Sequence, residues 1–237
     1  MRAPVLAGGV ALLAALGAAA GFVGGERLDQ PEVPGAFGLA APVPVASPSA
    51  PEVLPIKTPK PSSLKAFGTE GLDFGRRSFT VQQGKDKPVA VSIRVPDGWT
   101  LTRSTKTPGE VKFLDPLKER GVRVESGFPP DLSTNEFREK LTLELESSVP
   151  HEDDLRLLAQ TDTVLEDDDG QSRAVSTLIY TYIPNEVRRY VIVRWIATGD
   201  DEQATVEMSI TGLPQDAEGL TAVLDEATRS VEAKAKS

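Results

Sequence analysis

The sequence predicts an α+β domain in which an antiparallel β-sheet meander is covered by two main helices, preceded by an N-terminal apolar helix and a disordered linker. Three observations predict this class. Apolar and polar residues alternate with a period of two in several consecutive segments, which are separated by short turns. Two other segments have helical spacing. The first 65 residues differ in composition from both the alternating segments and the segments with helical spacing.

The first 25 residues have the layout of an export signal. Arg2 is followed by an uncharged run from Ala3 to Gly25, long enough to span roughly 30 Å of hydrocarbon. Ala18 and Ala20 offer a cleavage site, whereas continuation of the apolar run to Val23 favours retention, so the segment is a signal peptide or a signal anchor. Because Arg2 favours the cytoplasmic side, we expect the domain to be extracytoplasmic, either anchored in the cell membrane or secreted.

Residues 26–65 are dense in Pro, Ala and Ser and have no helical or strand periodicity. This composition predicts a disordered linker with extended polyproline II character, about 3.1 Å per residue, which could hold the domain on the order of 100 Å from the membrane. The remaining residues, 66–237, suffice for one globular domain with a single core.

Four short strands are predicted in the first half of this domain, at Ser78–Gln83, Val89–Val95, Val111–Leu114 and Gly121–Phe128. The first two form a hairpin across the charged turn at residues 84–87. After the second, Pro96 presets φ and Gly98 allows a tight turn, so Trp99 is expected to enter the core.

The period then changes to that of a helix. Ser133 and Glu136 have capping-box spacing ahead of a helix over Thr134–Ser147, whose apolar face carries Phe137, Leu141 and Leu145. A closing amphipathic helix is expected over Gln215–Ala233, with Leu220, Leu224 and Val231 on one face.

Four alternating segments between the two helices predict the antiparallel meander, at Leu155–Leu165, Ala174–Ile183, Val187–Thr198 and Ala204–Thr211. For the last hairpin we expect a core face formed by Val191, Val193, Trp195 and Ala197 opposite Val206, Met208 and Ile210.

The VPDGW segment at Val95–Trp99, the FLDP segment at Phe113–Pro116, the mid-chain helix, the meander and the closing helix together resemble the Mog1/PsbP-like fold. Specifically, they resemble the actinobacterial LpqN-type envelope lipoproteins over about Phe67–Val231. The resemblance implies a non-enzymatic envelope protein that acts as a binding module or assembly factor. Those lipoproteins carry a lipidated Cys after the signal, and this chain has no Cys at all.

The charge balance argues against nucleic-acid binding. The net charge is −9, and the acidic excess lies in the domain, with no basic stripe of the kind that supplies most nucleic-acid affinity. The lack of Cys removes a thiolate nucleophile and Cys metal ligands. We expect no cofactor, no metal site and no catalytic residue.

Two features of the sequence could support chemistry, and each also has a simpler interpretation. His151, the only histidine, could serve an envelope hydrolase, but it is also a typical histidine of a solvated loop. The acidic turn at residues 166–170 could bind a hard cation weakly, but it lacks the spacing of a calcium loop, which favours a hairpin turn of solvated carboxylates.

Aromatic and basic residues of the strands are the candidates for ligand binding: Trp99, Tyr180, Tyr182, Arg188, Arg194 and Trp195. The aromatic residues, with Tyr190, could line a groove between sheet and helix, or they could be core residues. Arg188 and Arg194 share parity and could receive a carboxylate or phosphate, or pair with acids such as Glu207.

These inferences predict an exported, membrane-tethered, non-enzymatic binding or scaffolding domain of the cell envelope. Its partner would be an envelope protein or a small apolar or wall-derived ligand, with contact to the membrane through the N-terminal segment. The alternatives are an envelope hydrolase acting through His151 and an accessory protein that senses the wall or a partner.

Overall fold

The computed structural model describes residues 54–82, 87–129, 131–199 and 201–235. The predicted leader, most of the predicted linker, and most of the turn at residues 84–87 lie outside these ranges. One compact unit extends from Ile56 to Ser237. No helix within the described residues is long and apolar enough to cross a membrane.

Seven strands form the larger sheet, in the order β3-β4-β5-β9-β8-β7-β6, and each neighbouring pair is antiparallel. The strands are β3 (Thr100–Arg103), β4 (Glu110–Leu114), β5 (Gly121–Ser126), β6 (Arg156–Glu166), β7 (Ser172–Tyr182), β8 (Arg189–Ile196) and β9 (Val206–Gly212). The predicted meander is therefore confirmed, and β3 is a strand that the sequence did not predict.

A smaller sheet contains β1 (Phe74–Val81), β2 (Val89–Pro96) and β10 (Glu232–Ala235), in the order β1-β2-β10. The predicted hairpin of β1 and β2 is confirmed. Between β2 and β3, Gly98 has a φ of 81° and the Trp99 N–H donates to the Pro96 carbonyl at 3.3 Å, which confirms the predicted turn.

The predicted end of the closing helix is wrong. A 3-10 turn at Pro214–Asp216 leads into α3 (Ala217–Ser230), and Glu232–Ala235 continues as β10, antiparallel to β2. The Ser230 hydroxyl accepts the Arg94 N–H at 2.8 Å and ties the helix end to β2. Pairing with β2 is a tertiary interaction, and it overrides the local helical spacing.

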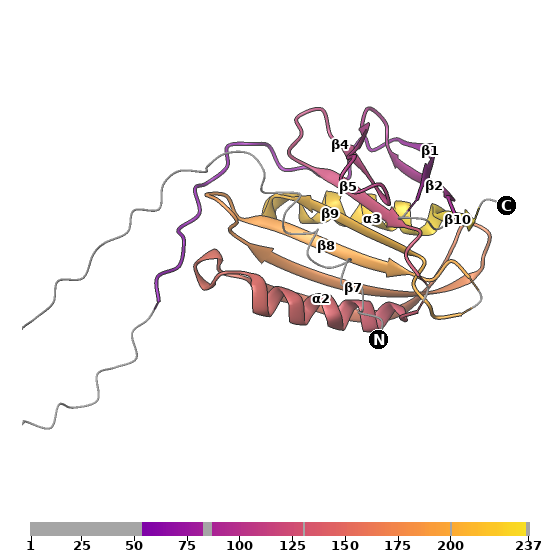
Figure 1. Ribbon diagram of the computed structural model, residues 1–237. Coiled ribbons are helices and arrows are strands. Elements are labelled where there is room, and N and C mark those ends of the chain that lie inside the picture. The colour runs from indigo at the N-terminus through magenta and orange to yellow at the C-terminus, as the bar shows by residue number, and fades with distance from the viewer. Residues whose placement is uncertain (1–53, 83–86, 130, 200, 236–237) are drawn as a thin grey trace, which may run out of the picture. The chain divides into compact units, whose positions relative to one another are not determined.

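The two helices lie on opposite faces of the seven-stranded sheet (Figure 1). Helix α2 (Thr134–Ser148) covers β7 and β8, and its predicted capping box is present, with the Ser133 N–H donating to Glu136 at 2.8 Å. Helix α3 packs against β8, β9 and β2, so the smaller sheet and α3 share the other face. A 3-10 turn at His151–Asp153 connects α2 to β6.

The predicted core face of the β8–β9 hairpin is also wrong. Ile192 lies opposite Ile210 and Ile196 opposite Val206, whereas Trp195 lies opposite Glu207. Since directly opposite residues share a face, Val191, Val193 and Trp195 point away from the face that carries Val206, Met208 and Ile210. Helices cover both faces of β8, so both of its faces are apolar and its alternation alone could not identify the register.

Candidate functional site

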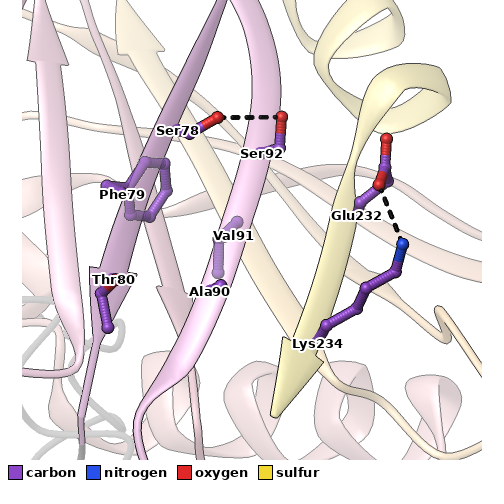
Figure 2. A pocket seen from close by; sticks show the side chains of 8 residues that line it. All are labelled: Ser78, Phe79, Thr80, Ala90, Val91, Ser92, Glu232 and Lys234. Atoms are coloured by element: carbon purple, nitrogen blue, oxygen red, sulfur yellow. Dashed lines mark hydrogen bonds and ion pairs between the residues drawn. The ribbon is translucent and has the colours of Figure 1, made fainter. Parts of the chain in front are cut away.

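An open groove of about 320 Å³ runs over the smaller sheet (Figure 2). It is lined by Ser78, Phe79, Thr80, Ala90, Val91, Ser92, Glu232 and Lys234. Phe79 and Val91 are buried in the core between the two sheets. The residues that alternate with them therefore point away from the core and form the outer surface of the sheet.

The groove exists because its central side chains are small. Ser78 lies opposite Ser92, and Thr80 lies opposite Ala90. The two serine hydroxyls are 3.4 Å apart, within hydrogen-bond distance (Figure 2). The floor of the groove thus presents the hydroxyls of Ser78, Ser92 and Thr80 and the methyl groups of Thr80 and Ala90.

Longer charged side chains border the groove on β10. Glu232 lies opposite Ser92 and Lys234 opposite Ala90, and the Lys234 ammonium contacts the Glu232 carboxylate at 3.3 Å (Figure 2). The Lys234 side chain is 78% exposed and that of Glu232 is 43% exposed, so this ion pair is weak and can be exchanged for contacts with another molecule.

Two arginines lie at one end of the groove, where Arg76 and Arg94 are directly opposite each other on β1 and β2. Asp168 accepts two hydrogen bonds from Arg94, at 2.7 and 2.6 Å, and lies 3.6 Å from Arg76. Arg76 also pairs with Glu232 at 3.1 Å. Asp168 therefore offsets the repulsion between the two guanidinium groups.

The acidic turn at residues 166–170 is organised by contacts within the chain. Asp167 accepts the N–H groups of Asp169 and Gln171 and pairs with Arg173 at 2.5 Å. Burial opposes ionisation of Asp167, but these N–H groups and the arginine hold the pKa of its carboxyl below the usual value. Within the described residues, no group of three or more His, Cys, Asp or Glu side chains is arranged to hold a metal ion.

The predicted aromatic candidates are buried in two separate places. Tyr180, Tyr182 and Trp195 are at most 4% exposed, and the two tyrosine rings lie 5.8 Å apart. Burial raises the pKa of Tyr180. Trp99 belongs instead to the core between the sheets, where its ring centroid lies 6.1 Å from that of Phe67. None of the four lines the groove.

The two arginine candidates are also apart. Arg188 precedes β8 and pairs with Asp154 at 2.5 Å, while Arg194 pairs with Asp225 of α3 at 2.7 Å. Arg188 lines a second open groove, of about 280 Å³, together with residues 59–62 of the predicted linker. In this stretch the Lys60 N–H donates to the Glu186 carbonyl at 2.7 Å, so these residues lie against the domain.

His151 begins the 3-10 turn after α2 and is exposed. Its imidazole makes no hydrogen bond or ion pair with any side chain that the structure describes. The charged residues beside it are engaged elsewhere, since Lys57 contacts both Glu152 and Asp153.

A buried charge cluster on β4, β5 and β9 was missed by sequence reasoning. The Arg123 guanidinium binds Glu110, Glu125 and Glu207, the last at 2.5 Å, and Glu207 also accepts the Trp195 indole N–H at 2.8 Å. Burial raises the pKa of Glu125 to about 7, with repulsion from the other glutamates adding to the effect and Arg123 opposing it. The sequence feature that could have indicated this cluster is the pair of charged residues at alternate positions in each of β4 and β5.

Comparison with family models finds no match, and comparison with curated proteins finds none either. Among solved structures, the chain is similar to the crystal structure of LpqN, a protein involved in cell envelope biogenesis of Mycobacterium tuberculosis. The identity is 15%, the match covers 67% of this chain and 91% of LpqN, and the TM-score is 0.38. This is a limited likeness of fold, and membership of the LpqN-type family stays a prediction.

Proposed function

We propose that this chain is a non-enzymatic binding or scaffolding protein of the cell envelope, and that the groove over β1, β2 and β10 receives a partner protein. The observation that carries the proposal is the outer surface of the smaller sheet, where hydroxyl-bearing side chains lie between charged ones. An envelope location rests on the leader, with Arg2 followed by the uncharged run to Gly25.

The chemistry of the groove favours a polar partner over a small apolar ligand. Pockets for small molecules are usually enclosed and mainly apolar, whereas this groove is open and bordered by Glu232 and Lys234. Its hydroxyls can donate and accept hydrogen bonds, and its exposed ion pair can be replaced by pairs across an interface. A protein surface with complementary charges fits this arrangement.

The hydrolase alternative requires His151 to activate a nucleophile or to be oriented by a carboxylate. Such a role needs a Ser or Asp side chain within hydrogen-bond reach, and among the described residues no side chain bonds to the imidazole. No specific contact favours this alternative, so the binding function is proposed as non-enzymatic.

Site-specific photo-crosslinking of the full chain in its native cells tests the proposal. A photoreactive residue in place of Thr80 lies in the groove, and the same residue in place of the exposed Thr102 of β3 is the matched control. We expect a protein adduct at position 80 that is absent at position 102. Ala90→Tyr should remove that adduct, because a large side chain opposite position 80 fills the groove.

Identical adducts at positions 80 and 102, or an adduct that persists after Ala90→Tyr, would contradict binding in the groove. The non-enzymatic part is tested separately by His151→Ala. If that variant is exported and folded but loses the activity of the chain in its host, the hydrolase alternative is favoured instead.

A further inference from the structure

The strands beneath the groove are basic on their outer surface, although the chain as a whole carries a net charge of −9. Among the residues that the structure describes on this face of β1, β2 and β10, Arg76, Arg94 and Lys234 are cations, and Glu232 is the one acid. The acid that lies between the two arginines, Asp168, comes from the turn between β6 and β7. The residues of the sheet itself therefore favour a negatively charged group at this end of the groove.

Arg76 and Arg94 are directly opposite each other, and like charges in this position destabilise a sheet. The Asp168 carboxylate offsets this cost, because it accepts two hydrogen bonds from Arg94 and lies 3.6 Å from Arg76. Guanidinium groups are well suited to binding carboxylates at interfaces. The three side chains are 32 to 43% exposed, so a carboxylate of another molecule can reach the arginine pair.

The turn that carries Asp168 is held in place by other contacts. Asp167 accepts two N–H groups of the turn and pairs with Arg173 at 2.5 Å. The Asp168 N–H donates to the Arg229 carbonyl at 3.2 Å. None of these contacts uses the Asp168 carboxylate. Rotation of the Asp168 side chain can therefore free both guanidinium groups while the turn stays where it is.

The arginine pair is continuous with the groove. The Arg76 guanidinium donates to the Ser92 hydroxyl at 3.2 Å and to the Glu232 carboxylate at 3.1 Å, and both of these residues line the groove. A molecule that lies on the groove floor can thus place an acidic side chain between Arg76 and Arg94.

We propose that the Arg76–Arg94 pair binds an Asp or Glu side chain of the partner protein, and that Asp168 competes with this side chain for the pair. The proposal rests on the binding function proposed for the groove and names the group by which the partner is recognised. A carboxylate is favoured because Asp168 shows that the pair accommodates one. Since an internal acid already occupies the pair, an acid without further contacts gains little there, and Asp168 thereby favours the partner that fits the groove.

Photo-crosslinking from position 80, in the full chain in its native cells, reports how much of the groove is occupied. Asp168→Asn removes the competing carboxylate and should raise the yield of the protein adduct about two- to fivefold, as expected for the loss of one exposed ion pair. Asp169→Asn is the matched control, because it makes the same change of charge at an exposed position of the same turn. Its yield should equal that of the parent chain, whereas Arg76→Gln should lower the yield.

A second measurement does not depend on the native partner. The purified full-length Asp168→Asn chain is titrated with hexaglutamate while the Nε–H signals of Arg76 and Arg94 are followed by NMR. Hexaglutamine is the uncharged control, and inorganic phosphate tests for a phosphate-bearing ligand. We expect both arginine signals to shift with hexaglutamate, at a lower peptide concentration than in the parent chain, and to stay unchanged with hexaglutamine.

The proposal is overturned if folded Asp168→Asn gives the parent yield of adduct, or if Asp169→Asn raises the yield equally, which would indicate general attraction between charged surfaces. These two variants decide the matter even if Arg76→Gln does not fold. Arginine signals that shift with phosphate but not with hexaglutamate would assign the pair to a phosphate-bearing ligand instead. The absence of an adduct at position 80 in every variant would contradict the function proposed for the groove itself. In that case the peptide titration alone would decide whether the pair binds carboxylates, and a lack of any shift would overturn this assignment too.

Discussion

Arg120 and Asp216, which are 96 positions apart in sequence, form a buried two-point ion pair, with both guanidinium–carboxylate distances at 2.9 Å. Asp216 is fully buried and also accepts the N–H groups of Phe67 and Leu213. Arg120 reaches the Lys65 carbonyl at 2.9 Å and lies over the Phe67 ring. The pair thus joins the start of the domain to β5 and to the start of α3.

We expect Asp216→Asn to lower the free energy of unfolding by about 1.5 to 3 kcal/mol, because it removes the carboxylate that accepts two hydrogen bonds from the buried Arg120 and leaves Asp115, at 3.4 Å, as its remaining ionic partner. The measurement is denaturant unfolding of the parent and variant chains. Glu186→Gln is the matched control: it breaks the exposed Lys60–Glu186 pair, and such pairs contribute about 0 to 1 kcal/mol. Equal effects from the two substitutions would contradict the role assigned to Asp216.

The same pair predicts a loss of stability in acid. Burial opposes ionisation of Asp216, but the Arg120 side chain and the two N–H groups hold the pKa of this carboxyl below its usual value. Its contribution is complete above about pH 4, the pKa in the unfolded chain, and is lost as the pH falls through the lower pKa of the folded state. In Asp216→Asn this part of the acid dependence should be missing, which unfolding curves between pH 2 and 6 would reveal.

Glu125 should make the stability of the chain depend on pH in the opposite direction from Asp216. Because burial raises the pKa of its carboxyl to about 7, the folded chain holds a proton between about pH 4.5 and 7 that the unfolded chain has lost. Glu125 therefore lowers stability as the pH rises through this window. Glu125→Gln should stabilise the chain by about 1 to 3 kcal/mol at pH 8 and by less at pH 5. Glu146→Gln, at an exposed position, is the control and should change stability by the same amount at both pH values. If Glu125→Gln behaves in the same way, the raised pKa of Glu125 is contradicted.

Elements governed by neighbouring residues were predictable from the sequence. The turn before Trp99 follows from Pro96 and Gly98, and the start of α2 follows from Ser133 and Glu136. Each depends only on contacts between residues a few positions apart in the sequence. The register of β8 depends instead on which layers cover the sheet. With three consecutive apolar residues at 191–193, a sequence pattern cannot tell one buried face from the other.

The candidate groove had no local signal. It forms where β10 is added beside β2, and the EAKA sequence of β10 is short and lacks the β-branched and aromatic residues that favour a strand. Its floor consists of Ser, Thr and Ala side chains, which by themselves indicate no binding site in a sequence. The sequence analysis named aromatic residues as candidates for ligand binding. Large aromatic side chains of a small domain are mostly buried in its core, and the structure buries Trp99 and Trp195 there.

Trp99 is predicted to be a major source of stability. Its side chain is only 7% exposed and packs against Phe67 in the core between the sheets. Trp99→Ala should lower the free energy of unfolding by about 3 to 5 kcal/mol, since it leaves a cavity. His151→Ala is the control at an exposed position and should change stability by less than about 0.5 kcal/mol. A Trp99→Ala chain as stable as the His151→Ala chain would show that position 99 does not support the core.

The leader predicts on which side of the membrane the domain lies. Arg2 is its only charge before Gly25, so the positive-inside tendency keeps the N-terminus in the cytoplasm and places the residues after Gly25 outside. Protease added to intact cells should remove the domain while a cytoplasmic marker stays intact. Cleavage is expected within the Pro-rich residues 26–53, leaving a resistant fragment that begins near Ile56, where the compact unit starts. Digestion that occurs only after the cells are lysed would place the domain in the cytoplasm and remove the basis for an envelope function.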